Sequence, residues 1–145
     1  MAWIKSIVQE LIDKYNTINP YELATNLNIE IISWDLHEDI RGFYKYDKRN
    51  KYIVCNINLD EEMKRVVCAH ELGHAILHPR ANTPFMRQHT LFSVDRIERE
   101  ANRFAAELLL PDDLFAGYEQ MTIYNIASLH NVPLELVELK CKKLF

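Results

Sequence analysis

The amino-acid sequence predicts an α+β fold in which a small antiparallel three-stranded sheet packs on a central helix and a second long helix. Short β-rich runs gather between residues 29 and 57, and long helical periodicity begins at Asp60. The chain has 145 residues, of which 48% are hydrophobic and 26% charged, with only 3 Gly and 5 Pro. A chain of this length and composition can bury one sizeable core, so we expect residues 1–145 to form a single domain.

The N-terminal segment predicts an amphipathic helix rather than a signal peptide. Polar residues interrupt its apolar residues, which recur at helical spacing: Ile4, Ile7, Val8, Leu11 and Ile12. Asn19 then offers a capping side chain, and Pro20 suits the first position of a helix. A short second helix from Tyr21 to Leu27 is therefore expected.

Three β-rich runs follow the second helix. They are Ile29–Trp34, Gly42–Tyr46 and Tyr52–Ile57. The polar stretch Asp47–Asn50 separates the last two runs and suits a hairpin turn. These runs are the three strands of the expected sheet.

Two long helices are expected after the strands. The first begins near Asp60 and ends before Pro79, and its apolar stripe contains Val66, Val67, Ala69, Ile76 and Leu77. The second extends from Val94 to Leu109 and stops at Pro111. Shorter helices complete the C-terminus, where Ile123–Cys141 resembles a helix-turn-helix.

The charge balance argues against a protein that works by binding nucleic acid. The chain has 17 Lys and Arg against 21 Asp and Glu, a net charge of -4, whereas phosphate binding usually needs a concentrated basic face. The three cysteines form no CxxC pair, which fits reduced thiols. No apolar run approaches the ~20 residues that cross a bilayer, so we expect a cytoplasmic protein with no membrane partner.

The central helix contains the sequence His70-Glu71-Leu72-Gly73-His74, which is the H-E-x-x-H pattern. Histidines four residues apart share one helical face, so both imidazoles can reach one metal ion. Neutral imidazoles suit Zn²⁺, and a catalytic zinc has three protein ligands and an open position. The pattern therefore predicts one zinc ion per chain, a third ligand elsewhere, and Glu71 as a general base toward water.

The helix Val94–Leu109 offers Glu98 and Glu100 as the third ligand. At about 100° per residue, Glu98 lies about 60° from the centre of the apolar stripe and Glu100 about 100° away on the other side. This favours Glu98 and leaves Glu100 as the alternative. Asn102 lies about 40° from Glu98, so its amide could hydrogen-bond a ligand in the second coordination shell. His78 lies too far along the helix axis for the same ion and is expected to face the C-terminal end of the helix dipole.

Three stretches resemble the ImmA/IrrE family of bacterial and phage metallopeptidases. They are Asn19–Ala24, His70–His78 and Glu98–Pro111. The H-E-x-x-H pattern is moderately specific, and its combination with a downstream E-x-x-A-N-x-F-A-A-x-L-L-x-P run is strong. Leu110 stands where the family often has Met, which is a mild apolar change.

The resemblance implies a zincin-like fold and a compact, ImmA-like metallo-endopeptidase of the phage or mobile-element type. Carried over position by position, it implies zinc on His70 and His74, Glu71 as the catalytic base and Glu98 as the third ligand. The implied substrate is an XRE-type helix-turn-helix repressor of a prophage or mobile element, so the protein would act as an anti-repressor. We expect the substrate to add a strand to the sheet at Tyr52–Ile57.

Two alternatives to proteolysis stay open. The protein could bind a metal and sequester a repressor without cutting it, or it could be a DNA-binding regulator through its C-terminal helices. The few cations of the would-be recognition helix cluster at its end, at Lys140, Lys142 and Lys143, which makes direct nucleic-acid binding the weaker reading. The group that stabilises the oxyanion is also open, and the candidates by chemistry are His78, His89, Tyr118 and Tyr124.

Overall fold

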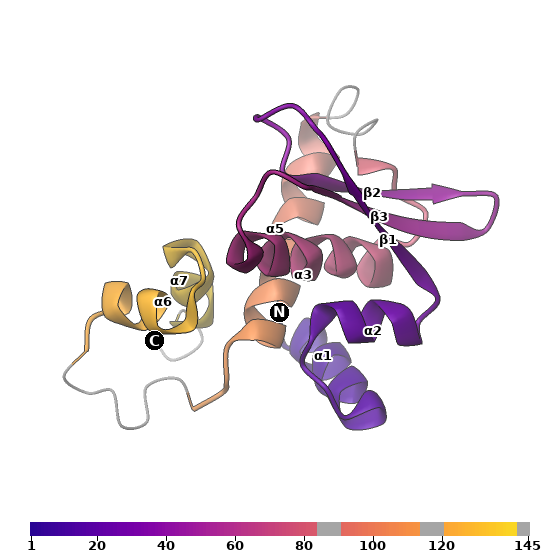
Figure 1. The fold of residues 1–145 in the computed structure, drawn as a ribbon. Coiled ribbons are helices and arrows are strands. Elements are labelled where there is room, and N and C mark those ends of the chain that lie inside the picture. The colour runs from indigo at the N-terminus through magenta and orange to yellow at the C-terminus, as the bar shows by residue number, and fades with distance from the viewer. Residues whose placement is uncertain (84–90, 114–120, 142–145) are drawn as a thin grey trace.

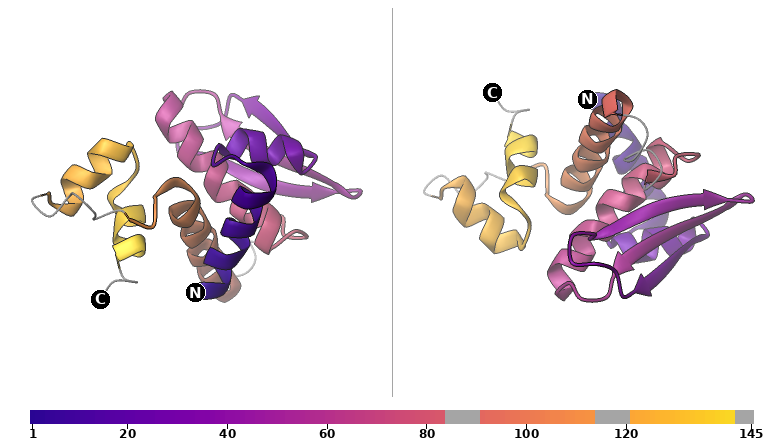
Figure 2. Two further views of the ribbon diagram at one scale, coloured as in Figure 1. Left: turned by 90° about the horizontal axis from the view of Figure 1, so that it is seen from below. Right: turned by 90° about the horizontal axis from the view of Figure 1, so that it is seen from above.

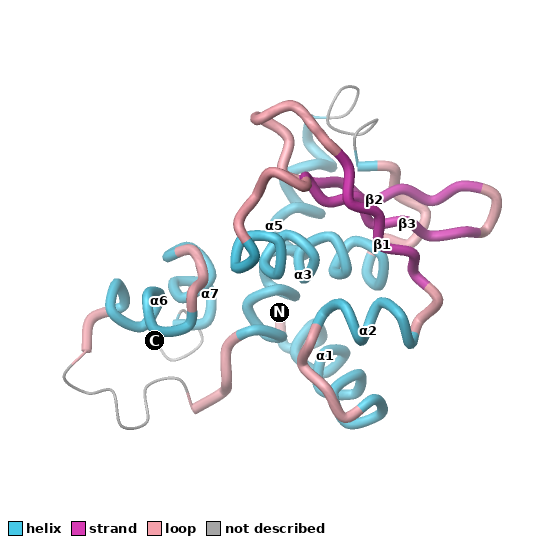
Figure 3. The backbone as a smooth tube through the Cα atoms, viewed as in Figure 1, coloured by secondary structure: helices cyan, strands magenta, loops and turns pink. Residues whose placement is uncertain are grey.

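The computed structural model describes residues 1–83, 91–113 and 121–141. The elements in chain order are α1 (Ala2–Tyr15), α2 (Pro20–Asn26), β1 (Ile29–Trp34), β2 (Gly42–Asp47), β3 (Asn50–Asn56), α3 (Glu61–Leu77), α5 (Leu91–Leu109), α6 (Ile123–His130) and α7 (Leu134–Cys141). The sheet covers one side of α3, and α5 crosses α3 (Figures 1 and 3). Both views of Figure 2 show α6 and α7 beside α5, away from the sheet. The predicted combination of a three-stranded sheet with two long helices is confirmed.

Capping residues begin two of the helices where the sequence predicts. The Asn19 side chain accepts a hydrogen bond from the Tyr21 backbone N–H at 2.9 Å, with Pro20 at the first helical position. The Asp60 side chain accepts from the Met63 N–H at 2.7 Å and begins α3. The end of α3 at Leu77 also agrees with the prediction, whereas α5 begins three residues before the expected Val94.

The expectation of a purely antiparallel sheet is wrong, because the strand order is β1-β3-β2 and β1 pairs with β3 in parallel. Only the β2–β3 hairpin is antiparallel, with Tyr44 opposite Ile53. The run Ile53–Cys55 is buried and apolar, so β3 takes the central place of the sheet. The buried side-chain amide of Asn56 donates to the carbonyls of Leu36 and Ile40, and it thereby holds the connection that crosses β3.

The central place of β3 also corrects the expected substrate edge at Tyr52–Ile57, because strands on both sides already use its backbone groups. The edges of the sheet are β1 and β2. On the outer edge of β2, the N–H groups of Tyr44 and Tyr46 donate to Thr83 Oγ1 and Asn82 Oδ1, each at 3.0 Å. On this edge, an added strand would therefore have to use the beginning of β2.

The core lies between the sheet and the helices, and it is closed by a close crossing of α3 and α5. A Cβ atom at Gly73 would lie 3.0 Å from Phe104 Cβ and 3.2 Å from the Cα of Ala101. Phe104 and Ala101 are fully buried at this crossing. Cys68 is buried in the same core. Among the described helices, none combines the length and the apolar composition needed to span a bilayer.

An ionic cluster around the buried Lys140 attaches α7 to α5 and to Asp112 just beyond it. Lys140 Nζ lies 2.9 Å from Glu107 Oε2 and 2.8 Å from Asp112 Oδ1, and Arg103 donates to the Leu139 carbonyl. α6 and α7 are two short helices joined by residues 131–133, within the segment where the sequence resembles a helix-turn-helix. Its Lys140, however, is buried against carboxylates, so this cation is unavailable to a phosphate backbone.

We expect Gly73→Val to lower the free energy of unfolding of the metal-free protein by about 1–3 kcal/mol, because the new side chain forces α3 and α5 apart. Urea unfolding in the presence of a chelator measures the effect. Arg99→Val, at an exposed position of α5, is the matched control and should change stability by less than about 1 kcal/mol. Equal unfolding midpoints for the two variants would contradict a close crossing at Gly73.

Candidate metal centre

The side chains of the H-E-x-x-H pattern converge on one face of α3. Ligand atoms of His70, Glu71 and His74 lie within 4.8 Å of one another. The His74 side chain is fully buried, 16% of the His70 side chain is exposed, and Glu71 is buried. Two imidazoles and a carboxylate at this spacing form a cluster that can hold a metal ion.

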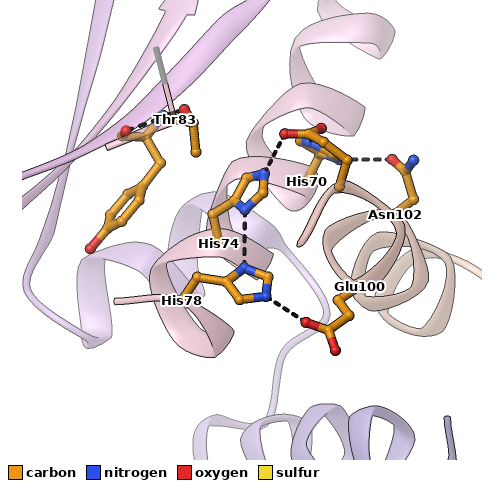
Figure 4. Close-up of polar contacts among 8 residues, drawn as sticks. His70, His74, His78, Thr83, Glu100 and Asn102 are labelled. Atoms are coloured by element: carbon orange, nitrogen blue, oxygen red, sulfur yellow. Dashed lines mark hydrogen bonds and ion pairs between the residues drawn. The ribbon is translucent and has the colours of Figure 1, made fainter. Parts of the chain in front are cut away.

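Glu98 of α5 faces both histidines across the helix crossing. Its Oε2 lies 2.9 Å from His70 Nε2, and its Oε1 lies 3.1 Å from His74 Nε2. Figure 4 shows the rings of His70 and His74 next to each other on α3. Glu100 is directed elsewhere, so of the two glutamates considered from the sequence, the structure brings Glu98 to the imidazoles.

The far side of the His70 ring contacts Asn102, one helical turn beyond Glu98. His70 Nδ1 lies 2.8 Å from Asn102 Oδ1. The amide oxygen can only accept, so Nδ1 carries a hydrogen, and Nε2 is the nitrogen that can exchange its own hydrogen for a cation. This is the contact that the helical spacing of Glu98 and Asn102 suggests.

Burial and charge act in opposite directions on these groups. Burial alone lowers the pKa of His70, but hydrogen bonding to Glu98 and the nearby carboxylates of Glu71 and Glu98 outweigh it and raise the pKa. Burial lowers the pKa of His74 to about 4, so this imidazole is neutral at pH 7. Burial alone would raise the pKa of the Glu98 carboxyl, yet its contacts with both histidines hold the pKa well below the usual range. The cluster therefore presents a carboxylate anion and a neutral imidazole, as metal ligation requires.

Two buried thiols near the site do not compete as ligands. Burial raises the pKa of Cys55 to about 11, and burial together with the neighbouring Cys55 and Glu71 raises the pKa of Cys68 further. Both residues therefore stay protonated at neutral pH, whereas zinc binds thiolates. The donor set available to the metal is nitrogen and oxygen.

His78 follows the last turn of α3 and does not reach the Glu98 carboxylate. Its Nδ1 lies 3.1 Å from His74 Nδ1, and its Nε2 lies 2.7 Å from Glu100 Oε1. The sequence suggested an interaction with the helix dipole, and it missed these two side-chain partners. The spacing of four residues between His74 and His78 was the available signal.

A cleft of about 560 Å³ opens beside the cluster. Segments from four parts of the chain line it: residues 39–42, Met63, Val66, Val67, His70, Glu71, Glu98, Asn102, Pro133, Glu135 and Leu136. Sequence reasoning missed the contributions of Ile40–Gly42 and of α7, because no local motif marks them. Of the oxyanion candidates, His89 and Tyr118 lie outside the described residues, and Tyr124 is exposed on α6.

Comparison with known proteins identifies the family. A model of the M78 peptidases, described as the IrrE N-terminal-like domain, matches residues 24–142. The chain belongs to this family. It is also 32% identical to Metallopeptidase ImmA of Bacillus subtilis (strain 168) over 145 residues, which cover 97% of this chain and 85% of that protein.

A second relative comes from a phage. The chain is 60% identical over 139 residues to Uncharacterized immunity region protein 2 of Bacillus phage phi105, with 94% of this chain and 88% of that protein covered. The resemblance of the sequence to the ImmA/IrrE family is thus confirmed. Membership of the M78 family, together with the His-Glu-His cluster, identifies a metallopeptidase with a metal site.

We expect the metal-free protein to take up one zinc ion per chain and to become more stable on binding. At a free concentration of 100 times the dissociation constant, the gain in unfolding free energy is about 2.7 kcal/mol. Calorimetric titration and thermal unfolding measure stoichiometry and stabilisation.

Glu98→Gln should abolish most of this stabilisation, because it removes the anionic oxygen between the two imidazoles. His37→Gln is the control, since the His37 side chain is 65% exposed in the β1–β2 connection. Unchanged zinc binding by Glu98→Gln would exclude this carboxylate as a ligand.

Proposed function

We propose that this protein is a zinc-dependent endopeptidase that cleaves a helix-turn-helix repressor of a prophage or mobile element and so relieves repression. The observation that supports the chemistry best is the Glu98 carboxylate, whose two oxygens each contact the Nε2 atom of one H-E-x-x-H histidine. A site of this kind has three protein donors and an open side toward the cleft. We infer that residues 1–145 work as one metallopeptidase domain.

The donors fit zinc. His70 and His74 would bind it through Nε2 and Glu98 through its carboxylate, which is the nitrogen and oxygen set of many catalytic zinc sites. Asn102 would orient His70 by accepting a hydrogen bond from its Nδ1–H. When bound, zinc would act as a Lewis acid toward the scissile carbonyl and would activate water.

Glu71 would supply the proton transfers. It lies next to His70 on α3, and it lines the cleft together with His70 and Glu98. Its carboxylate would take a proton from the attacking water and pass the proton to the amine that leaves. The surrounding apolar side chains would exclude other water, which strengthens these charge interactions.

The substrate proposal draws on the cleft and on the relatives. The names of the two relatives refer to a phage immunity region and to a metallopeptidase, which supports a protein substrate in phage immunity. We infer an XRE-type repressor as this substrate and the cytoplasm as the place of cleavage. A substrate strand would pair at the beginning of β2, where Gly42 lines the cleft and where Tyr44 and Tyr46 beyond it are already bonded to Thr83 and Asn82.

Binding without cleavage is the competing function, and Glu71 distinguishes the two. We expect Glu71→Gln to retain zinc and repressor binding but to reduce cleavage about 10²–10⁴-fold, because the amide cannot accept the proton. Co-expression with the repressor encoded beside the gene, followed by intact-mass measurement, detects the fragments.

Glu62→Gln is the matched control, because Glu62 is an exposed carboxylate on the first turn of the same helix. The control should cut the repressor like the wild type. If Glu71→Gln relieves repression as much as the wild type does while the repressor stays intact, sequestration is favoured over proteolysis.

A substitution at Ile40 tests whether the substrate binds in the cleft. The Ile40 side chain is 43% exposed at the cleft, so Ile40→Glu should raise KM about tenfold, or about 1.4 kcal/mol, without changing zinc content. Ile57→Glu is the matched control, because Ile57 is 51% exposed near the same end of the sheet and does not line the cleft. Equal KM values for the two variants would place substrate binding elsewhere.

A further inference from the structure

We propose that His78 and Glu100 form a positioning pair that fixes the ring orientation of His74. This inference rests on the proposed function, because it assigns to both residues a part in holding the zinc ligand. Neither residue belongs to the H-E-x-x-H pattern or contacts the Glu98 carboxylate. Figure 4 shows the three side chains in line, from His74 through His78 to Glu100.

The distances define a continuous hydrogen-bonded chain. His74 Nδ1 lies 3.1 Å from His78 Nδ1, and His78 Nε2 lies 2.7 Å from Glu100 Oε1. The His78 side chain is 10% exposed and the Glu100 side chain 13% exposed, so protein atoms shield both contacts from water. Side-chain hydrogen bonds of this kind are strengthened by a low local dielectric.

The direction of each hydrogen bond follows from the chemistry of the end groups. Glu100 as a carboxylate can only accept, so His78 Nε2 carries a hydrogen and donates it. When a metal occupies Nε2 of His74, the hydrogen of this ring lies on Nδ1, and His78 Nδ1 is placed to accept it. In the metal-free structure Nε2 faces the Glu98 carboxylate, which can only accept, so metal binding replaces a hydrogen on Nε2. The pair therefore holds the ring in the orientation that a metal ligand needs.

The two ligand histidines thus have equivalent support from different residues. His70 Nδ1 contacts the Asn102 amide oxygen directly, whereas His74 reaches a carboxylate through a second imidazole. Glu98, Glu100 and Asn102 all come from α5, so one helix supplies a ligand, the partner of His70 and the carboxylate that holds His78. Outer partners of ligating histidines commonly raise ligand basicity and hold the ring.

The test measures zinc affinity by competition with a chelator at one fixed pH. His78→Leu and Glu100→Leu should each weaken zinc binding about 10–100-fold. The double variant should bind no more weakly than His78→Leu alone, because Glu100 acts through His78. His78→Asn should restore most of the affinity, because its amide oxygen lies near the position of imidazole Nδ1.

A second readout separates positioning from general destabilisation. In the Co²⁺-substituted protein, the visible absorption bands report the geometry at the metal, and we expect them to shift in His78→Leu and to return toward the wild type in His78→Asn. His37→Leu and Glu138→Leu are the matched controls at exposed positions and should leave affinity and spectrum unchanged.

The outcomes distinguish this inference from the proposed function. Wild-type protein that binds no zinc would overturn both. The positioning pair alone would be overturned if the wild type binds zinc and if His78→Leu and Glu100→Leu bind zinc with the same affinity as the wild type and show the same Co²⁺ spectrum. A loss of urea stability in the metal-free variants without a change in affinity would also overturn it.

Discussion

The close approach of α3 and α5 is the constraint on which the metal centre depends. Gly73 permits this approach, because a side chain there would meet Phe104 and Ala101. It lies between the two histidines of the H-E-x-x-H pattern in sequence, and the facing helix presents Glu98 within 3.1 Å of both imidazoles. A separation of even 1 Å would break these contacts, since hydrogen bonds and metal–ligand bonds tolerate little change in distance. The packing of α3 against α5 therefore requires the glycine at this position of the H-E-x-x-H pattern.

Concentrating so many polar groups in a core is costly unless each has a partner. The structure meets this condition by pairing acids on α5 with imidazoles on α3, so that Glu98 contacts His70 and His74 and Glu100 contacts His78. The pKa values show the same two effects: burial disfavours the charged forms of His70 and Glu98, and their contacts with each other favour these forms. The pairs make the relative position of the two helices specific, because sliding one helix by a turn would leave buried charges without partners.

Periodic and local signals predicted most of the elements and the cluster on α3. Caps at Asn19 and Asp60 and the four-residue spacing of the histidines are decided by neighbours in sequence, so they can be read without tertiary structure. The helical wheel also favoured Glu98 over Glu100, because the side of α5 that faces the core follows from its apolar stripe. The parallel β1–β3 pairing could not be predicted, since strand order depends on the Asn56 amide holding a distant connection. The His78–Glu100 contact was missed because no motif links these two residues, which come from the end of α3 and from α5.

The helix-turn-helix-like sequence of α6 and α7 has a structural explanation that needs no DNA. The Lys140 ammonium is buried between Glu107 and Asp112, so α7 is attached to α5 by the cation that a recognition helix would offer to phosphate. This attachment places Pro133 and Leu136 in the lining of the cleft, together with residues 39–42. The C-terminal helices therefore complete the cleft beside the metal centre, and their packing against α5 links the shape of the cleft to the same helix that presents Glu98.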